Sequence, residues 1–161
     1  MSDFSDALQE RLTANADLAR QRAAAEEEMD RERREAEAAA AQQDQSQREQ
    51  HALLAAHVAD LADRLKASRP DSFIVRTGWT ESGEEYIAKM TTRQMSPKRS
   101  LFIEVDRDDD EILARWTSEI GNAIEIWRLM DVTPAMLTLL VLQVADDSAW
   151  TGRRPPPFPT M

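Results

Sequence analysis

The spacing of hydrophobic residues divides this chain at Pro70 into two parts with different patterns. Residues 1–69 contain neither glycine nor proline and consist mostly of helix-forming residues, so they predict one long helix over residues 3–67. Ser2 or Ser5 can cap its start, and Pro70 disfavours helix in the residue before it. We therefore expect a long N-terminal helix attached to a smaller domain.

The large apolar residues of this predicted helix lie mainly at its two ends. Between them is a charged stretch in which Glu27–Arg31 and Asp30–Arg34 form i,i+4 pairs worth about 0.2–0.5 kcal/mol each. Because such pairs and alanine favour a helix without burial, this middle can be helical while it remains solvated. The two apolar groups are Phe4, Leu8, Leu12 and Leu18 at the start, and Leu54, Val58, Leu61 and Leu65 at the end.

The second apolar group has the 4-3-4 spacing that is typical of a coiled-coil seam. We therefore predict that it binds a protein partner or a second copy of the chain. Two alternatives remain open. The group could pack on the C-terminal domain, or the helix could break around residues 42–46 and fold back, which would bring the two groups together. The predicted seam residues are Leu54, Val58, Leu61 and Leu65.

Beyond Pro70, three segments alternate apolar and polar residues as β-strands do. They cover residues 73–79, 85–92 and 101–106, and Gly83 lies in a short turn between the first two. The simplest connection of these strands is an antiparallel meander. Its expected covered face consists of Phe73, Val75, Tyr86, Ala88, Met90, Leu101, Ile103 and Val105.

Two helices are expected after these strands. The first begins with a capping box, Asp108 and Glu111, and its apolar residues through Met130 lie on an arc of about 120°. The second has Thr133 as its N-cap and Pro134 at the first helical position, and it is apolar nearly all round. That composition favours burial of the second helix on more than one side.

The sequence thus predicts an α+β fold in which a long helix is followed by a three-stranded meander packed by two helices. Residues 1–69 form the helical arm, 70–150 the small domain, and 151–161 a proline-rich tail that is expected to be disordered. The spacing Arg153-x-x-Pro156-x-x-Pro159 also matches ligands of SH3-type grooves, although a plain tail is the simpler interpretation.

The formal net charge of −10 is acidic in both halves, which argues against broad binding to nucleic acid or anionic membrane. The chain has no cysteine, so disulfides and thiolate metal sites are excluded. Its longest apolar run, residues 135–145, is too short to span a bilayer. The acidic N-terminus lacks the apolar core of a secretory signal, so we expect a cytoplasmic protein without membrane partners.

No motif of a serine hydrolase, phosphate loop, dinucleotide fold or zinc protease occurs. Asp106, Asp108 and Asp110 have the spacing that begins a calcium loop, but the required glycine and glutamate are missing, and helix capping explains them better. His51 and His57 are six residues apart, which places them on different faces of a helix. We therefore expect no enzyme, no cofactor and no metal site.

A basic cluster free of acids, Arg93, Lys98 and Arg99, flanks the predicted tip of the second hairpin. It is a candidate contact for nucleic acid or another anion. The alternative is a solvated turn whose charges protect the edge of the sheet.

The order of long helix, three strands and helix resembles the layout of YbaB-type nucleoid-associated proteins, which dimerise and bind DNA, and of small secretion chaperones. The resemblance covers layout alone, and the acidic balance and the helix at 134–149 depart from a DNA-binding assembly.

We predict a non-enzymatic interaction or assembly protein that oligomerises or docks a partner through the ends of its long helix. The alternatives are a nucleic-acid-associated regulator that uses the basic hairpin, and a chaperone-like binder of an apolar peptide.

Overall fold

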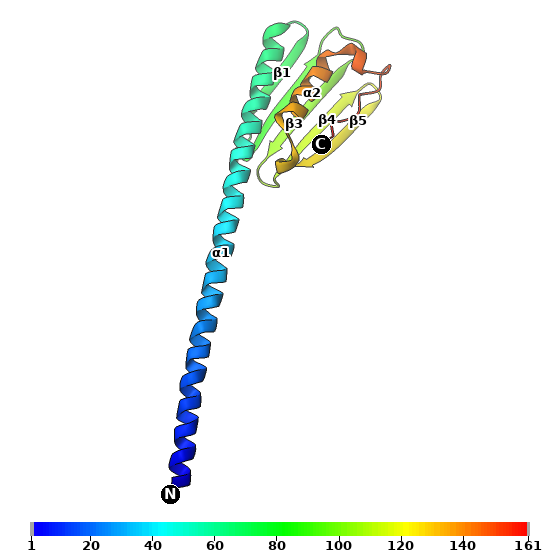
Figure 1. Ribbon diagram of the computed structural model, residues 1–161. Helices are drawn as coiled ribbons and strands as arrows, with labels where there is room; N and C mark the ends of the chain where they lie inside the picture. Colours follow the sequence, from blue (N-terminus) through cyan, green and yellow to red (C-terminus); the bar gives the residue numbers. More distant parts are fainter. Residues whose placement is uncertain (1, 161) are drawn as a thin grey trace. The chain divides into compact units, whose positions relative to one another are not determined.

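The computed structural model describes residues 2–160 and has an α+β fold (Figure 1). The long N-terminal helix is confirmed, and an antiparallel sheet and a short helix follow it. Two short 3-10 turns flank the second helix. The elements are α1 Ser2–Ser68, β1 Phe73–Trp79, β2 Glu85–Thr92, β3 Arg99–Asp106, β4 Glu111–Ser118, β5 Gly121–Arg128, η1 Leu129–Asp131, α2 Pro134–Ala145 and η2 Asp147–Ala149.

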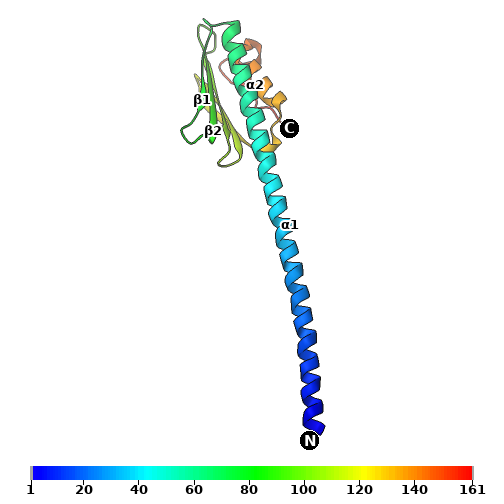
Figure 2. The same ribbon diagram turned by 90° about the vertical axis from the view of Figure 1, so that its left-hand side faces the viewer.

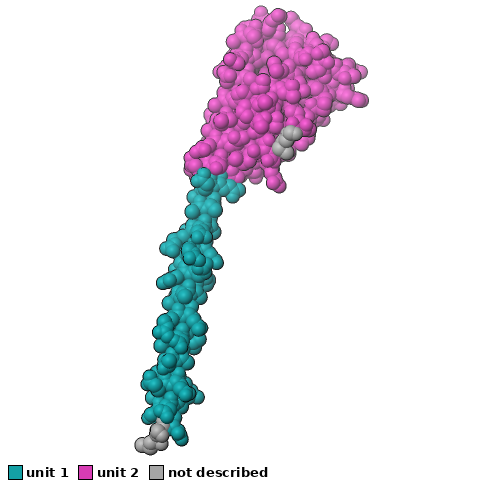
Figure 3. Space-filling model, viewed as in Figure 1, with its two compact units in different colours: residues 1–44 teal, residues 45–161 magenta. Residues whose placement is uncertain are grey.

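Helix α1 belongs to both compact units of the chain, because the boundary between them falls after Asp44 (Figure 3). The helix runs without a break through residues 42–46, so the hairpin alternative is wrong. The absence of glycine and proline from the whole stretch is the local reason for this continuity.

The charged middle of α1 does carry ion pairs along the helix, at i,i+3 spacing and, between Arg33 and Glu37, at i,i+4 spacing. Arg31 pairs with Glu28, and Arg33 pairs with Asp30 at 3.4 Å. Both are exposed i,i+3 pairs, which stabilise a helix about as well as the predicted i,i+4 pairs.

The sheet has five antiparallel strands in the order β1-β2-β3-β4-β5, so the prediction of three strands is wrong in number. The first three strands are confirmed, and β3 begins two residues earlier than expected, at Arg99. Gly83 lies in the turn between β1 and β2 with φ +74°, a conformation that glycine adopts without steric cost.

The prediction of a helix between Asp108 and Met130 is wrong, because these residues form β4, β5 and the turns beside them. The predicted capping box is a turn between β3 and β4. In it, the Asp106 carboxylate accepts a hydrogen bond from the Asp108 amide at 2.8 Å, and Asp110 adopts φ +53°. Aspartate stabilises such turns by this same local hydrogen bonding, so the acids belong to a turn and not to a helix start. Consequently one α-helix, not two, follows the sheet within residues 2–160.

The C-terminal part of α1, from Leu54 onward, and helix α2 cover the same face of the sheet (Figure 2). Seven of the eight residues predicted for this face are buried and the eighth, Val75, is half-buried. The predicted start of α2 is also confirmed, since Thr133 Oγ1 accepts a hydrogen bond from the Met136 amide and Pro134 follows it. No helix of the described chain covers the opposite face of the sheet.

The tail that the sequence predicts as unpacked has no helix or strand within residues 151–160, yet it contacts the domain. The Phe158 ring packs edge-on against Trp127, with 6.0 Å between ring centroids. Pro156 and Pro159 are buried, so these two prolines of the SH3-type spacing are not on the surface.

Candidate interaction surfaces

The predicted seam in the second half of α1 lies inside the molecule. Leu54 and Val58 are fully buried, Leu65 is nearly so, and Leu61 is half-buried at the edge. These side chains pack in the same core as β2, β3 and α2. Their coiled-coil-like spacing therefore serves contact with the chain's own sheet, and of the four only Leu61 and the edge of Leu65 line a surface that a partner could reach.

The predicted basic cluster is divided between surface and core. Arg93 and Lys98 are exposed, whereas Arg99 is 2% exposed. Arg99 Nε donates to the Val144 carbonyl at 2.8 Å, and Nη2 donates to the Asp147 carboxylate at 2.6 Å. Since its hydrogen bonds are used within the fold, Arg99 is not available to a nucleic acid or another anion.

The first apolar group of α1 is exposed to solvent, unlike the predicted seam residues, which are mostly buried. Every side chain from Asp3 to Gln43 is exposed except that of Ala7, which is half-buried. Phe4 is 73% exposed, and Met29 is similar at 67%. The exposed large apolar residues of this stretch, here called the arm stripe, are Phe4, Leu8, Leu12, Leu18 and Met29.

A second apolar surface is the groove between the C-terminal part of α1 and α2. It is lined by Leu61 and Leu65 from α1 and by Val141 and Leu142 from α2, with Arg64 at its margin. Leu142 is 59% exposed, so the groove is open to solvent. This helix–helix groove is a largely apolar hollow that could receive a side chain from outside.

Hydrogen bonds fix the two helices that form this groove. His57 Nε2 lies 2.8 Å from Thr138 Oγ1, and Thr138 Oγ1 itself donates to the Pro134 carbonyl. His57 Nε2 is therefore the donor to Thr138. Gln50, earlier on α1, donates to the Val132 carbonyl at 2.8 Å, just before α2 begins.

His51 has a structural role that its sequence position does not reveal. Its Nε2 lies 3.0 Å from both the Glu84 and the Val105 carbonyl oxygens, so this nitrogen carries a proton and donates to them. The ring also contacts Trp79, with centroids 5.5 Å apart. The available signal was that His51 lies three residues before the predicted seam residue Leu54. Its partners could not be predicted, because they come from the loop before β2 and from β3 and are distant in sequence.

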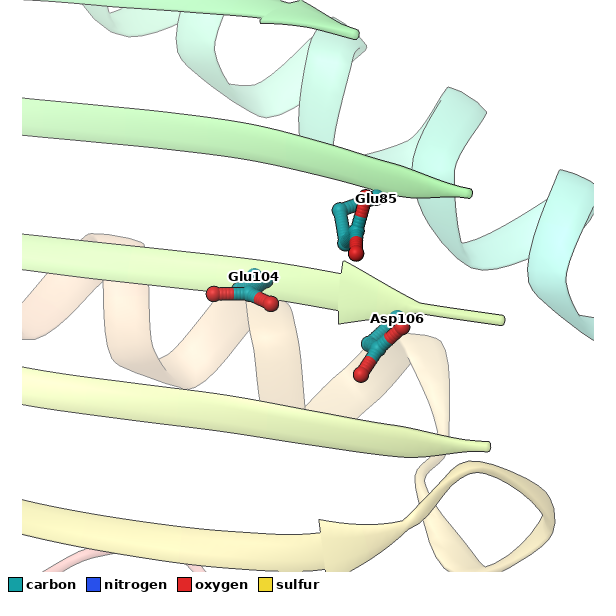
Figure 4. Close-up of side chains that lie close together, drawn as sticks. All are labelled: Glu85, Glu104 and Asp106. Carbon is teal, nitrogen blue, oxygen red and sulfur yellow. The ribbon is translucent and has the colours of Figure 1, made fainter. Parts of the chain in front are cut away.

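Three carboxylates meet at one end of the uncovered sheet face, and Figure 4 shows them on β2 and β3. Carboxylate oxygens of Glu85, Glu104 and Asp106 lie within 4.8 Å of one another. Hydroxyl donors at Thr80 and Ser82 lower the pKa of Glu85.

The pKa values of the other two members of this carboxylate cluster, Glu104 and Asp106, are shifted in the opposite direction. Partial burial, and then repulsion by neighbouring acids, raises the pKa of Glu104. Burial likewise raises the pKa of Asp106, against the amide donors of Asp108 and Asp109. Oxygen ligands of this kind suit Ca²⁺, but clusters of exposed acids are common without an ion, so the direct consequence of the geometry is charge repulsion.

Comparisons with protein-family models, with curated proteins and with solved structures found no match. Among residues 2–160, no helix combines the length and the apolar content that crossing a membrane requires. The surfaces themselves therefore bear on function, because a fold alone does not define one.

Proposed function

We propose that this chain is a non-enzymatic assembly protein whose interaction element is the N-terminal part of α1, residues 3–43. The observation that carries the proposal is the arm stripe, a set of large apolar side chains that are exposed on residues 3–43. Water-exposed apolar side chains gathered on one element are typical of a surface that binds another protein.

The members of the arm stripe share one side of the helix. At 100° per residue they fall within an arc of about 120°, from Leu18 through Phe4 to Leu12. An arc of this width is what an amphipathic helix presents to another helix. Burial of a leucine or phenylalanine side chain contributes about 1.5–3 kcal/mol, so several of them provide enough free energy for association.

The charged stretch between Glu26 and Glu37 explains why the arm can be helical before it binds. The ion pairs of Arg31 and Arg33 stabilise the helix locally, and they are exposed. This stretch lacks a continuous seam, which favours an interaction concentrated at the end of the helix over a zipper along its length.

The test is the oligomeric state of the full chain, measured by size exclusion with light scattering. We expect the wild type to self-associate at concentrations well above micromolar, and the double variant Phe4→Glu, Leu8→Glu to remain monomeric. The matched control is Gln9→Glu, Thr13→Glu, which adds the same charge to exposed positions of neighbouring turns on the other side of the helix. A wild type that is strictly monomeric, and that retains no protein partner in a pull-down, would contradict the proposal.

A second candidate function is the binding of an apolar segment of another protein in the helix–helix groove. Its support is the exposure of Leu142 beside an apolar lining. In that case Leu142→Asp would abolish binding of the segment while the variants of the arm stripe would not.

A further inference from the structure

We infer that the helix–helix groove is the docking site for the N-terminal end of α1 from a second copy of this chain, lying antiparallel to the α1 that lines the groove. This inference rests on the proposed function and names the partner of the arm stripe. One apolar surface of the chain is a helical ridge, and the other is a hollow between two helices.

The direction of the groove follows from the two helices that line it. Residue 57 of α1 lies beside residue 138 of α2, and Leu61, Leu65 and Ser68 line the groove together with Val141, Leu142 and Ala145. The two helices therefore run in the same direction there. A third helix placed in this hollow would contact both and complete a three-helix layer on the sheet, which is how helices usually bury an apolar stripe.

The spacing of the arm matches the spacing of the groove. Phe4, Leu8 and Leu12 are four residues apart, or about 6 Å per step along the helix. Leu61 and Leu65 have the same separation. An antiparallel helix that places Leu8 at the level of Leu61 therefore brings Phe4 to the level of Leu65.

Charge favours this antiparallel direction. The first turns of the arm carry Asp3, Asp6 and Glu10, and Arg11 is the one base among residues 3–17. The stretch 64–69 at the other end of α1 contains three bases and no acid, namely Arg64, Lys66 and Arg69. Arg64 Nε also forms an exposed ion pair with Asp60 Oδ2 at 3.6 Å. Arg64 nevertheless remains among the residues that line the groove.

Helix dipoles act in the same direction as the side-chain charges. An antiparallel arrangement places the positive N-terminal end of one helix beside the negative C-terminal end of another. The acids of the arm and the bases at residues 64–69 would then face each other across the groove, which supplies orientation more than affinity.

The test uses the absence of cysteine from the chain, so that introduced cysteines are the sole thiols. Full-length Leu8→Cys is mixed with full-length Leu142→Cys under mild oxidation, and products are separated without reductant. We expect a disulfide between position 8 of one copy and position 142 of the other, because the proposed docking brings the two positions together and a disulfide requires Cα atoms about 4.4–6.8 Å apart.

The control for this cross-link is Leu139→Cys, mixed with Leu8→Cys in the same way. Leu139 is an exposed site on α2 that lies beside the tail at Pro157 and not in the groove. It should form at least tenfold less of the mixed disulfide. Equal yields from Leu139→Cys and Leu142→Cys would show that the groove has no preference for the arm.

A second measurement does not depend on cross-linking. Leu142→Asp should weaken self-association of the full chain at least tenfold in light scattering, whereas Leu139→Asp should leave it unchanged. Both side chains are exposed, so neither substitution removes a core contact.

The outcomes separate this inference from the proposed function. Efficient disulfide formation between two copies of Leu8→Cys alone, with no effect of Leu142→Asp, would show arms pairing with arms in parallel. That result would overturn the inference that the arm docks in the groove, while the proposed function as an assembly protein would stand. A wild type that stays monomeric at every concentration would overturn the groove as the site of self-association, and one that also retains no protein partner in a pull-down would overturn both.

Discussion

Arg99 connects the start of β3 to the segment that follows α2. Besides Val144 and Asp147 it donates to the Pro97 carbonyl at 3.0 Å, and its guanidinium lies 5.3 Å from the centroid of the Trp150 ring. The carboxylate partner is largely exposed, while the guanidinium is fully buried. The side chain therefore satisfies buried main-chain acceptors that would otherwise lack a donor.

Replacement of Arg99 by alanine should lower the free energy of unfolding by about 2–4 kcal/mol, because two buried carbonyl groups lose their donor and a large side chain leaves a void. Urea unfolding followed by tryptophan fluorescence measures this change. The neighbouring Lys98→Ala should change stability by less than about 0.5 kcal/mol, as expected for an exposed residue. Equal effects of the two substitutions would contradict the structural role of Arg99.

The carboxylate cluster on the uncovered sheet face makes stability depend on pH. Glu104 and Asp106 have a raised pKa in the folded chain, so they retain a proton over a pH range in which the unfolded chain has lost it. Their contribution to the free energy of unfolding therefore falls as pH rises from about 4 through the raised values. Glu85, whose pKa is lowered, contributes in the opposite sense and loses its contribution as pH falls.

The substitution Glu104→Gln should stabilise the protein at pH 7 by about 0.5–1 kcal/mol, because it removes one charge from the cluster. Urea unfolding should be measured at about pH 4.5 and about pH 7, since the carboxylates lose their protons above about pH 4. The gain in the free energy of unfolding should be larger at the higher pH. Glu125→Gln on exposed β5 is the matched control and should change neither value. A gain that is equal at both pH values would exclude charge repulsion as its cause.

The β4–β5 hairpin shows where a pattern of apolar residues is ambiguous. Ile112, Ala114 and Trp116 alternate toward the covered face, but Leu113 and Ile124 lie on the uncovered face and obscure that alternation. With apolar residues on both faces, the positions also fit a helical arc. Gly121, at φ +124°, was the local sign of a turn within the supposed helix.

By contrast, β1, β2 and β3 could be predicted because most of their covered positions are apolar and most of their other positions are polar. The same holds for α2, where Thr133 and Pro134 fix the start of the helix. In α1, the residue pattern predicted the helix and identified its apolar side, but it did not predict which element this side packs against. The same spacing of leucines over residues 54–65 fits packing against a second helix and packing against a sheet. The choice between them depends on the tertiary structure, which the spacing does not specify.

Adjacent leucines on α1 allow this assignment to be tested. Leu54 is fully buried and Leu53 is 52% exposed. Leu54→Ala should lower the free energy of unfolding by about 2–5 kcal/mol, since it creates a cavity in the core, and Leu53→Ala should change it by less than about 0.5 kcal/mol. Chemical denaturation of the two variants checks both values. If Leu54 lined an intermolecular seam instead, its effect would increase with protein concentration.

At the scale of the whole molecule, the chain separates a unit with a core from a stretch of helix without one. Every residue of the core cluster lies at or beyond Leu54. The arm stripe could be recognised in the sequence as an apolar group, whereas the groove could not. The groove requires α2 to lie beside α1, and that adjacency is produced by the five intervening strands.

A chain that begins at Gln45 should therefore fold with the stability of the full protein. At low concentration, where association contributes little, the free energies of unfolding should agree within about 0.5 kcal/mol. Light scattering should show that the shortened chain is monomeric at concentrations where the full chain associates. A shortened chain that fails to fold would mean that residues 2–44 contribute to the core.

The continuity of α1 has a consequence for how its exposed part becomes ordered. An isolated helix must form a costly first turn, but here turns beyond His51 are already held by the core and can act as the nucleus. Helix then extends toward the N-terminus one hydrogen bond at a time, and amide hydrogen exchange should slow progressively from Asp3 toward His51. A partner would thus meet a segment that has already lost much of its conformational entropy, which reduces the ordering penalty of binding.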